Sequence, residues 1–140
     1  MKTPFLGLVL SILVVGCGGG PPDEKLPAVF PVEGTVTLDG TAVAGATVTF
    51  IHPETEKNAI GRTNEKGEFK LTTFKPDDGA LAGRHNIVVT QYDEPVADAN
   101  GVVPAAKNGL PKRYETIDGS QLHEEVTAAG PNKFEIKLTK

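Results

Sequence analysis

The sequence is poor in cysteine, tryptophan and other aromatic residues. Its one cysteine is Cys17, tryptophan is absent, and aromatic residues make up only 6% of the chain. An internal disulfide framework and a cysteine-ligated structural zinc site are therefore excluded, and stacking on sugars or bases is disfavoured. The net charge of −4 also argues against binding to nucleic acid or to an anionic membrane surface.

A long apolar run that could cross a bilayer is also missing. The apolar run Phe5–Val15, interrupted by Gly7 and Ser11, is shorter than the roughly 20 residues that a transmembrane helix needs. Preceded by the basic Lys2, it has the form of the apolar region of a secretory signal peptide. We therefore interpret residues 1–16 as a signal peptide.

The segment Val14-Val15-Gly16-Cys17 closes this region and resembles the bacterial lipobox. The resemblance implies that Cys17 receives a diacylglyceryl group and becomes the mature N-terminus, and two or more acyl chains hold a protein stably on a membrane. By the same analogy, an aspartate in place of Gly18 would favour the inner membrane, so an outer-membrane anchor is expected. An ordinary signal peptide with an incidental cysteine is the alternative.

Residues 17–30 are expected to form a tether between this anchor and the folded part. The stretch Gly18–Gly20 is flexible, and Pro21 and Pro22 stiffen the second half of the tether. One small domain is then predicted over residues 31–140, in the periplasm or at the cell surface.

Alternating apolar and polar residues predict strands through this domain. Val32, Val36 and Leu38 share one face while Glu33 and Thr35 share the other, which is the pattern of a half-buried strand. Seven short strands, Gly-rich turns and no convincing helix predict an all-β fold, a seven-stranded antiparallel Greek-key sandwich. The strands are expected at 32–38, 46–51, 59–63, around Phe69 and Leu71, at 84–92, 122–127 (where a helical turn is the alternative) and 133–138.

A family resemblance is carried by Gly34-x-Val36, Asp39-Gly40, Val43-x-Gly45-Ala46-x-Val48-x-Phe50, Thr63-x-x-x-Gly67-x-Phe69 and the closing Asn132-x-Phe134-x-Ile136-x-Leu138. Together they resemble the carboxypeptidase regulatory-like domain, a transthyretin (prealbumin)-like sandwich that some small bacterial lipoproteins carry alone. The resemblance covers about residues 32–138. It implies a non-catalytic module, because such domains are appendages or cell-surface modules in larger proteins.

Patterns that would indicate catalysis or metal binding are few. Ser120 lies in Asp-Gly-Ser-Gln-Leu, which is not a nucleophile elbow, so a turn serine is expected. His52, His85 and His123 are far apart in the sequence, and His85, on an inward face, is expected to be a core histidine with its hydrogen bonds satisfied. We therefore expect no enzyme activity, no cofactor and no metal site.

The long segment 93–119 is the predicted functional region, because loops above about 12–15 residues in compact domains are usually functional or disordered. A flexible or edge-covering loop is the alternative. Asp98, Asn100 and Gly101 also resemble a fragment of a calcium loop, without its terminal glutamate. The expected function is a structural or protein-interaction module, and a ligand-binding module for glycan or calcium is the alternative. The residues expected to contact an envelope protein or a glycan are Tyr92, Asp93, Glu94, Lys112, Arg113 and Tyr114.

Overall fold

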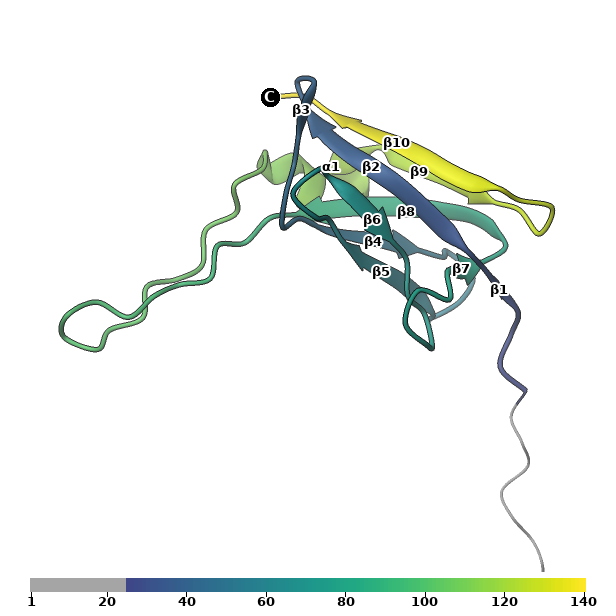
Figure 1. Ribbon diagram of the computed structural model, residues 1–140, viewed down its shortest axis with the longest axis horizontal. Helices are drawn as coiled ribbons and strands as arrows, with labels where there is room; N and C mark the ends of the chain where they lie inside the picture. The colour runs from purple at the N-terminus through teal and green to yellow at the C-terminus, as the bar shows by residue number, and fades with distance from the viewer. Residues whose placement is uncertain (1–24) are drawn as a thin grey trace, which may run out of the picture.

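The computed structural model describes residues 25–140, so the predicted signal peptide, Cys17 and most of the tether lie outside the described residues. The described chain forms two four-stranded β-sheets that pack face to face (Figure 1). The predicted all-β sandwich is therefore confirmed. No helix within residues 25–140 is long and apolar enough to cross a membrane. The elements are β1 (Val29–Phe30), β2 (Val32–Leu38), β3 (Thr41–Ala42), β4 (Thr47–Ile51), β5 (Asn58–Arg62), β6 (Glu68–Lys70), β7 (Ala80–Leu81), β8 (Gly83–Thr90), the 3-10 helix η1 (Lys112–Glu115), α1 (Ile117–Ser120), β9 (Leu122–Val126) and β10 (Asn132–Leu138).

The first sheet has the order β10-β2-β3, with β6 also paired to β2, and the second has the order β5-β4-β8-β9. Each of the seven predicted strands corresponds to one strand of three or more residues. β1, β3 and β7 are two-residue strands, too short for alternation to reveal. β1 pairs with β7, so the first strand within residues 25–140 starts at Val29, just before the predicted domain boundary at residue 31.

One pairing differs from the all-antiparallel prediction. β10 runs parallel to β2 over its whole length, with Asn132 opposite Val32 and Leu138 opposite Leu38. The turn after β9 carries the chain from the second sheet to the first, so β10 begins at the end of the sandwich where β2 begins. Alternation reports which face of a strand is buried and not the direction of its neighbour. The Greek-key order and the transthyretin-like relationship stay predictions.

The core lies between the two sheets and is centred on Phe50 of β4. The ring centroid of Phe50 lies 6.4 Å from that of Phe69 and 5.9 Å from that of Phe134, both on the opposite sheet. Inward residues of each strand are buried because strand side chains alternate between faces, as the sequence predicted. The largest fully buried side chains are Phe50, Leu71, Ile87, Leu138, His85, Val36, Val48, Val89 and Val126.

A single carboxylate orders the loop that leads into β7. Asp78 accepts hydrogen bonds from the backbone amides of Thr73 at 2.7 Å, Phe74 at 3.0 Å and Lys75 at 2.8 Å. Partial burial raises the pKa of Asp78, but these hydrogen bonds to the charged form outweigh burial and hold the pKa below its ordinary value. Gly79 follows with φ of 101° and donates its amide to Leu71 O at 2.9 Å. The loop thereby places β7 beside β1.

The two helical turns η1 and α1 cover one end of the second sheet, in the segment predicted as loop. Tyr114 of η1 is buried, and its hydroxyl accepts from the Thr139 amide at 2.9 Å and donates to Thr139 O at 3.2 Å. Arg113 donates to the Tyr114 hydroxyl at 3.1 Å, to Thr139 Oγ1 at 2.8 Å and to Thr139 O. Desolvation raises the pKa of Tyr114, but its bonds to Thr139 and Arg113 lower it overall. These bonds fasten η1 to the residue that follows β10.

Candidate functional site

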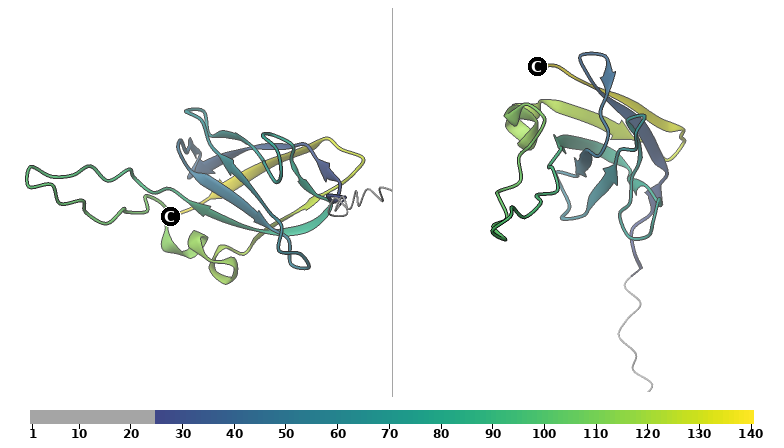
Figure 2. Two further views of the ribbon diagram at one scale, coloured as in Figure 1. Left: turned by 90° about the horizontal axis from the view of Figure 1, so that it is seen from below. Right: turned by 60° about the vertical axis from the view of Figure 1, so that its left-hand side comes forward.

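A two-legged arm projects from the end of β8, and we define it as residues 93–107. It leaves the sandwich as two extended legs joined by a tight turn, and no other segment of the described chain covers it (Figures 1 and 2). Every residue of the arm is exposed. At its base, Tyr92 and Asn108 form a β-bridge and the Asp93 amide donates to Lys107 O at 3.1 Å.

Asn108 fixes the base of the arm to the domain. Its Oδ1 accepts from the Gln91 amide at 2.8 Å and from the Leu110 amide at 3.1 Å, and its Nδ2 donates to Glu115 Oε1 at 2.6 Å. The Tyr92 hydroxyl reaches the same Glu115 oxygen at 3.5 Å. The arm therefore starts from a set of hydrogen bonds that joins β8 to η1, which gives it a defined direction.

Asp98 orders the tip of the arm. Its Oδ1 accepts from the Asn100 amide at 2.8 Å and the Val102 amide at 2.9 Å, while Gly101 takes φ of 78° in the turn. The carboxylate that resembles a calcium ligand in the sequence is therefore engaged in a local turn. Residues 25–140 contain no group of three or more His, Cys, Asp or Glu side chains placed to hold a metal ion.

The legs of the arm carry exposed valines and one proline each. Val96, Val102 and Val103 have exposed fractions of 81%, 60% and 59%. The legs keep one register, because Tyr92 lies opposite Asn108 at the base and the Asp98 amide bonds Val102 O at the tip. Between these points Pro95 and Pro104 have no backbone N–H to donate. They therefore weaken the pairing between the two legs, and they also make it harder for another strand to pair with the outer edge of either leg. The valine side chains, rather than the backbone, are thus the surface that the arm offers.

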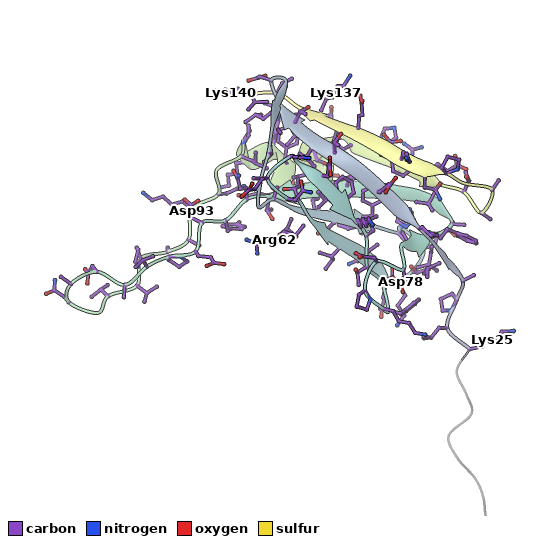
Figure 3. The ribbon with its side chains drawn as sticks, viewed as in Figure 1. Lys25, Arg62, Asp78, Asp93, Lys137 and Lys140 are labelled. Carbon is purple, nitrogen blue, oxygen red and sulfur yellow. The ribbon has the colours of Figure 1, made fainter. Side chains whose placement is uncertain are left out.

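The six predicted contact residues fall into two groups. Tyr92, Asp93 and Glu94 lie at the base of the arm, where Figure 3 labels Asp93. Lys112 and Arg113 lie on η1, which the Tyr92–Glu115 hydrogen bond joins to the base of the arm. Tyr114, expected in the contact patch, is 5% exposed and its hydroxyl is hydrogen-bonded to Thr139, so its side chain contributes almost no surface to that patch.

The three arm valines were missed as candidate residues. The sequence contained a signal for them, because valines in a long loop rich in Pro, Ala and Asp are expected to stay exposed to solvent. Sequence reasoning favoured charged and aromatic side chains in that loop instead. Because all three valines lie on the same projecting element, we treat them as further candidate contact residues.

Ser120 and the three histidines take separate places in the fold. The Ser120 hydroxyl is buried and donates to Ile87 O at 2.6 Å, which agrees with the structural role expected. His123 is exposed on β9, whereas the rings of His52 and His85 lie with centroids 5.0 Å apart. His85 is buried as predicted, but only its Nδ1 is hydrogen-bonded, so the expectation of a fully satisfied histidine is wrong.

A broad open groove of about 940 Å³ runs over β10, β2 and β6 to the edge of β5. Both signs of charge line it, and Lys133 Nζ lies 3.0 Å from Glu33 Oε1. The hydrogen bond and charge of Lys133 lower the pKa of Glu33. Both side chains are well exposed, so this ion pair contributes little to stability. The groove shows no excess of one charge that would select an ionic ligand.

The described chain is therefore a two-layer β-sandwich bearing one exposed arm. No family model, curated protein or solved structure matches it. The resemblance to the carboxypeptidase regulatory-like family accordingly stays a prediction made from the motifs.

Proposed function

We propose that this protein is a non-catalytic, lipid-anchored envelope protein that captures a protein partner with its arm, residues 93–107. One observation carries the proposal: the arm is ordered at base and tip, yet each of its three valines has more than half of its surface exposed. Solvent-exposed apolar side chains cost free energy unless a partner covers them. A long excursion held in one direction is typical of a recognition element.

The charges of the arm define the chemistry of its partner. The arm has three acidic residues, Asp93, Glu94 and Asp98, and one basic residue, Lys107, so its exposed valines are accompanied by a net negative charge. A matching surface is an apolar slot on a protein, rimmed by lysine or arginine. Like charges on two arms disfavour pairing between copies, and an anionic lipid surface would repel the arm.

The position of the arm fits a membrane anchor at Cys17. The described chain enters the sandwich at β1, and the arm projects from the opposite end (Figures 1 and 2). An acylated N-terminus would hold the β1 end toward the membrane and direct the arm away from it. The partner would then lie on the side of the domain that faces away from the anchoring membrane.

Replacement of residues 94–106 by Gly-Gly tests the arm as the contact. Because the Asp93 amide already bonds Lys107 O, a two-residue turn can close the base. We expect the melting temperature to change by less than about 2 °C, since every residue of the arm is exposed and none belongs to the core. In a second experiment, a photo-crosslinking amino acid replaces Val102 in the full-length chain, which is expressed in cells so that it reaches its native membrane. We expect one discrete crosslinked adduct. The same amino acid in place of Ile117, which lies outside the arm, should give no such adduct.

The arm charges provide the matched control. Glu94→Lys, added to the chain that carries the crosslinker at Val102, should reduce the yield of the adduct several-fold. In a pull-down assay, the purified partner should bind the full-length chain and should not bind the Gly-Gly variant. A partner that binds the Gly-Gly variant as tightly as the full-length chain would contradict the arm as contact. Equal adducts from Val102 and Ile117 would do the same.

Substitution of Cys17 tests the anchor. We expect the full-length chain to incorporate a labelled fatty acid and to sediment with membranes, and Cys17→Ser to do neither, because the acyl chains supply the membrane affinity. Detection by gel fluorescence and membrane fractionation checks both. Undiminished acyl label on Cys17→Ser would contradict lipidation at this residue, without bearing on the arm.

The groove over β2 and β10 supports the second candidate, a glycan-binding module. It is open and lined by side chains that can donate and accept hydrogen bonds, such as Thr35, Asn64 and Glu135. It offers no fully exposed aromatic platform, because the lining residue Phe69 is 3% exposed and the other lining aromatic, Phe134, is half-buried with its ring centroid 5.9 Å from that of Phe50 in the core. The arm therefore supports the stronger proposal.

A further inference from the structure

A buried histidine with one unsatisfied nitrogen lies at the start of β8. His85 is completely inaccessible to solvent and points between the sheets. Its Nδ1 lies 3.0 Å from Gly83 O, so Nδ1 carries the hydrogen and donates it. Its Nε2 is buried and has no hydrogen-bond partner within residues 25–140. A buried polar atom without a partner costs free energy, so this arrangement calls for a physical reason.

His52, at the end of β4, lies edge-on to His85. The two rings meet at 88°, and His52 Nε2 lies 3.3 Å from Ala82 O. The Glu54 amide donates to His52 Nδ1 at 3.2 Å, so Nε2 carries the hydrogen. The two histidines thus bond two consecutive carbonyls, Ala82 O and Gly83 O, at the junction of β7 and β8.

The other elements packed around His85 bring one carboxylate to its face of the sheet, and that carboxylate is not bonded to the ring. Glu124 of β9 lies directly opposite His85 and is half-buried, but no hydrogen bond or ion pair within the described chain joins it to either ring. On its own strand the neighbouring Arg84 is exposed on the other face. Across the sandwich, the inward residues of β2 and β10 near this end are uncharged, among them Val32 and Phe134.

The junction that the histidines hold is also the attachment point of β1. β7 ends at Leu81 and pairs with β1, with Val29 opposite Leu81 and Phe30 opposite Ala80. β1 is the first regular element of the described chain. Anything that frees the β7–β8 junction therefore loosens the connection between the sandwich and the chain that precedes it.

We propose that His52 and His85 form an acid-sensitive latch: in mild acid, protonation of His85 opens the β7–β8 junction and releases β1 while the rest of the sandwich stays folded. A protonated Nε2 would be a charged donor without an acceptor, which the core cannot accommodate. The ring reaches water most cheaply past His52, which breaks the bonds to both carbonyls. Local opening of a short terminal strand costs less than global unfolding. In a membrane-anchored chain the released residues would lengthen the tether.

The direction of the pH effect is set by burial. Desolvation lowers the pKa of His85, the bond to Gly83 raises it and the charge of His52 lowers it, so the folded pKa lies below its ordinary value near 6.5. The opened form binds a proton more readily than the closed form. The latch is therefore stable above about pH 6.5 and weakens as the pH falls toward the folded pKa.

Amide hydrogen exchange of the full-length chain between pH 7.5 and 5 tests the latch. We expect the protection factors of amides in β1 and β7 to fall by up to about tenfold per pH unit once the pH is below the pKa that His85 has in the opened form, since opening takes up one proton. Val48 and Val89, at the centre of the second sheet, should keep their protection. His85→Phe preserves an aromatic ring that cannot titrate and should abolish the pH dependence, and His123→Gln, at an exposed position, should retain it.

Three results would overturn the proposal. They are protection in β1 and β7 that does not depend on pH, an undiminished pH dependence in His85→Phe, and an equal loss of protection at Val48. If His85→Phe does not fold, the ring signal of His85 in the wild-type chain decides. It must titrate together with the loss of protection, and a ring that is still neutral when β1 opens contradicts the latch.

Discussion

Phe50→Ala is expected to lower the free energy of unfolding by about 3–5 kcal/mol, the range for removal of a fully buried phenylalanine. Phe50 has no exposed surface, and its ring is the point at which the two sheets meet, against Phe69 and Phe134. The alanine would leave a cavity bounded by side chains from both sheets, which cannot all move inward together. Urea denaturation followed by circular dichroism measures the change.

The control for this prediction is Ile60→Ala. Ile60 lies on β5, which pairs with β4, but its side chain is 50% exposed, so its truncation should cost well under half as much. Equal losses in the two variants would show that strand propensity, rather than contact between the sheets, sets the stability. If Phe50→Ala lowered the free energy of unfolding by less than about 1 kcal/mol, the two sheets would not be tightly packed around this ring.

Gly79→Ala is expected to cost about 3 kcal/mol or more, a large effect for one methyl group. Gly79 has φ of 101°, which side-chain-bearing residues rarely adopt, and a Cβ there would overlap the carbonyl group of Phe30. The next residue, Ala80, is the partner of Phe30 in the β1–β7 pair. The substitution should therefore displace β1 in addition to straining the turn.

Gly101→Ala separates these two causes. Gly101 also has a positive φ, of 78°, but nothing lies within 4 Å of the position its Cβ would take. It should lose about 1 kcal/mol from backbone strain alone. Thermal melts of both variants, with hydrogen exchange in β1 as a second measurement, test the comparison. If Gly79→Ala is no worse than Gly101→Ala, the contact between the loop and β1 contributes nothing.

The seven main strands could be predicted because their inward residues alternate with polar ones and the turns between them contain glycine. The parallel pairing of β2 with β10 could not, since a register between distant strands leaves no mark within either of them. β1 and β7 were missed because two-residue strands are too short to show a period. Their pairing depends on the loop that leads into β7, in which the hydrogen bonds of Asp78 set the position of Gly79.

Prediction of the candidate site was less complete. The length of the segment after β8 pointed to a special role, but length alone could not separate the arm from the part that folds back as η1 and α1. The burial of Tyr114 could not be predicted because its hydrogen-bond partner, Thr139, is far away in the sequence. The orphaned Nε2 of His85 was also out of reach, because alternation showed that His85 faces inward but not what its nitrogens meet.

The pairing of the first long strand with the last one sets the order of events when the protein folds. The Asn132 side chain bonds Pro31 O across 101 residues of sequence, and β10 extends this contact to Leu138. Until β10 has been synthesised, one long edge of β2 is unpaired and the first sheet is incomplete. The first sheet can therefore be completed only when residues 132–138 are available, and folding should be slow for a domain of this size because the contacts between β2 and β10 are non-local. During that interval the open edge of β2 is the part of the nascent chain most in need of protection from pairing with other strands.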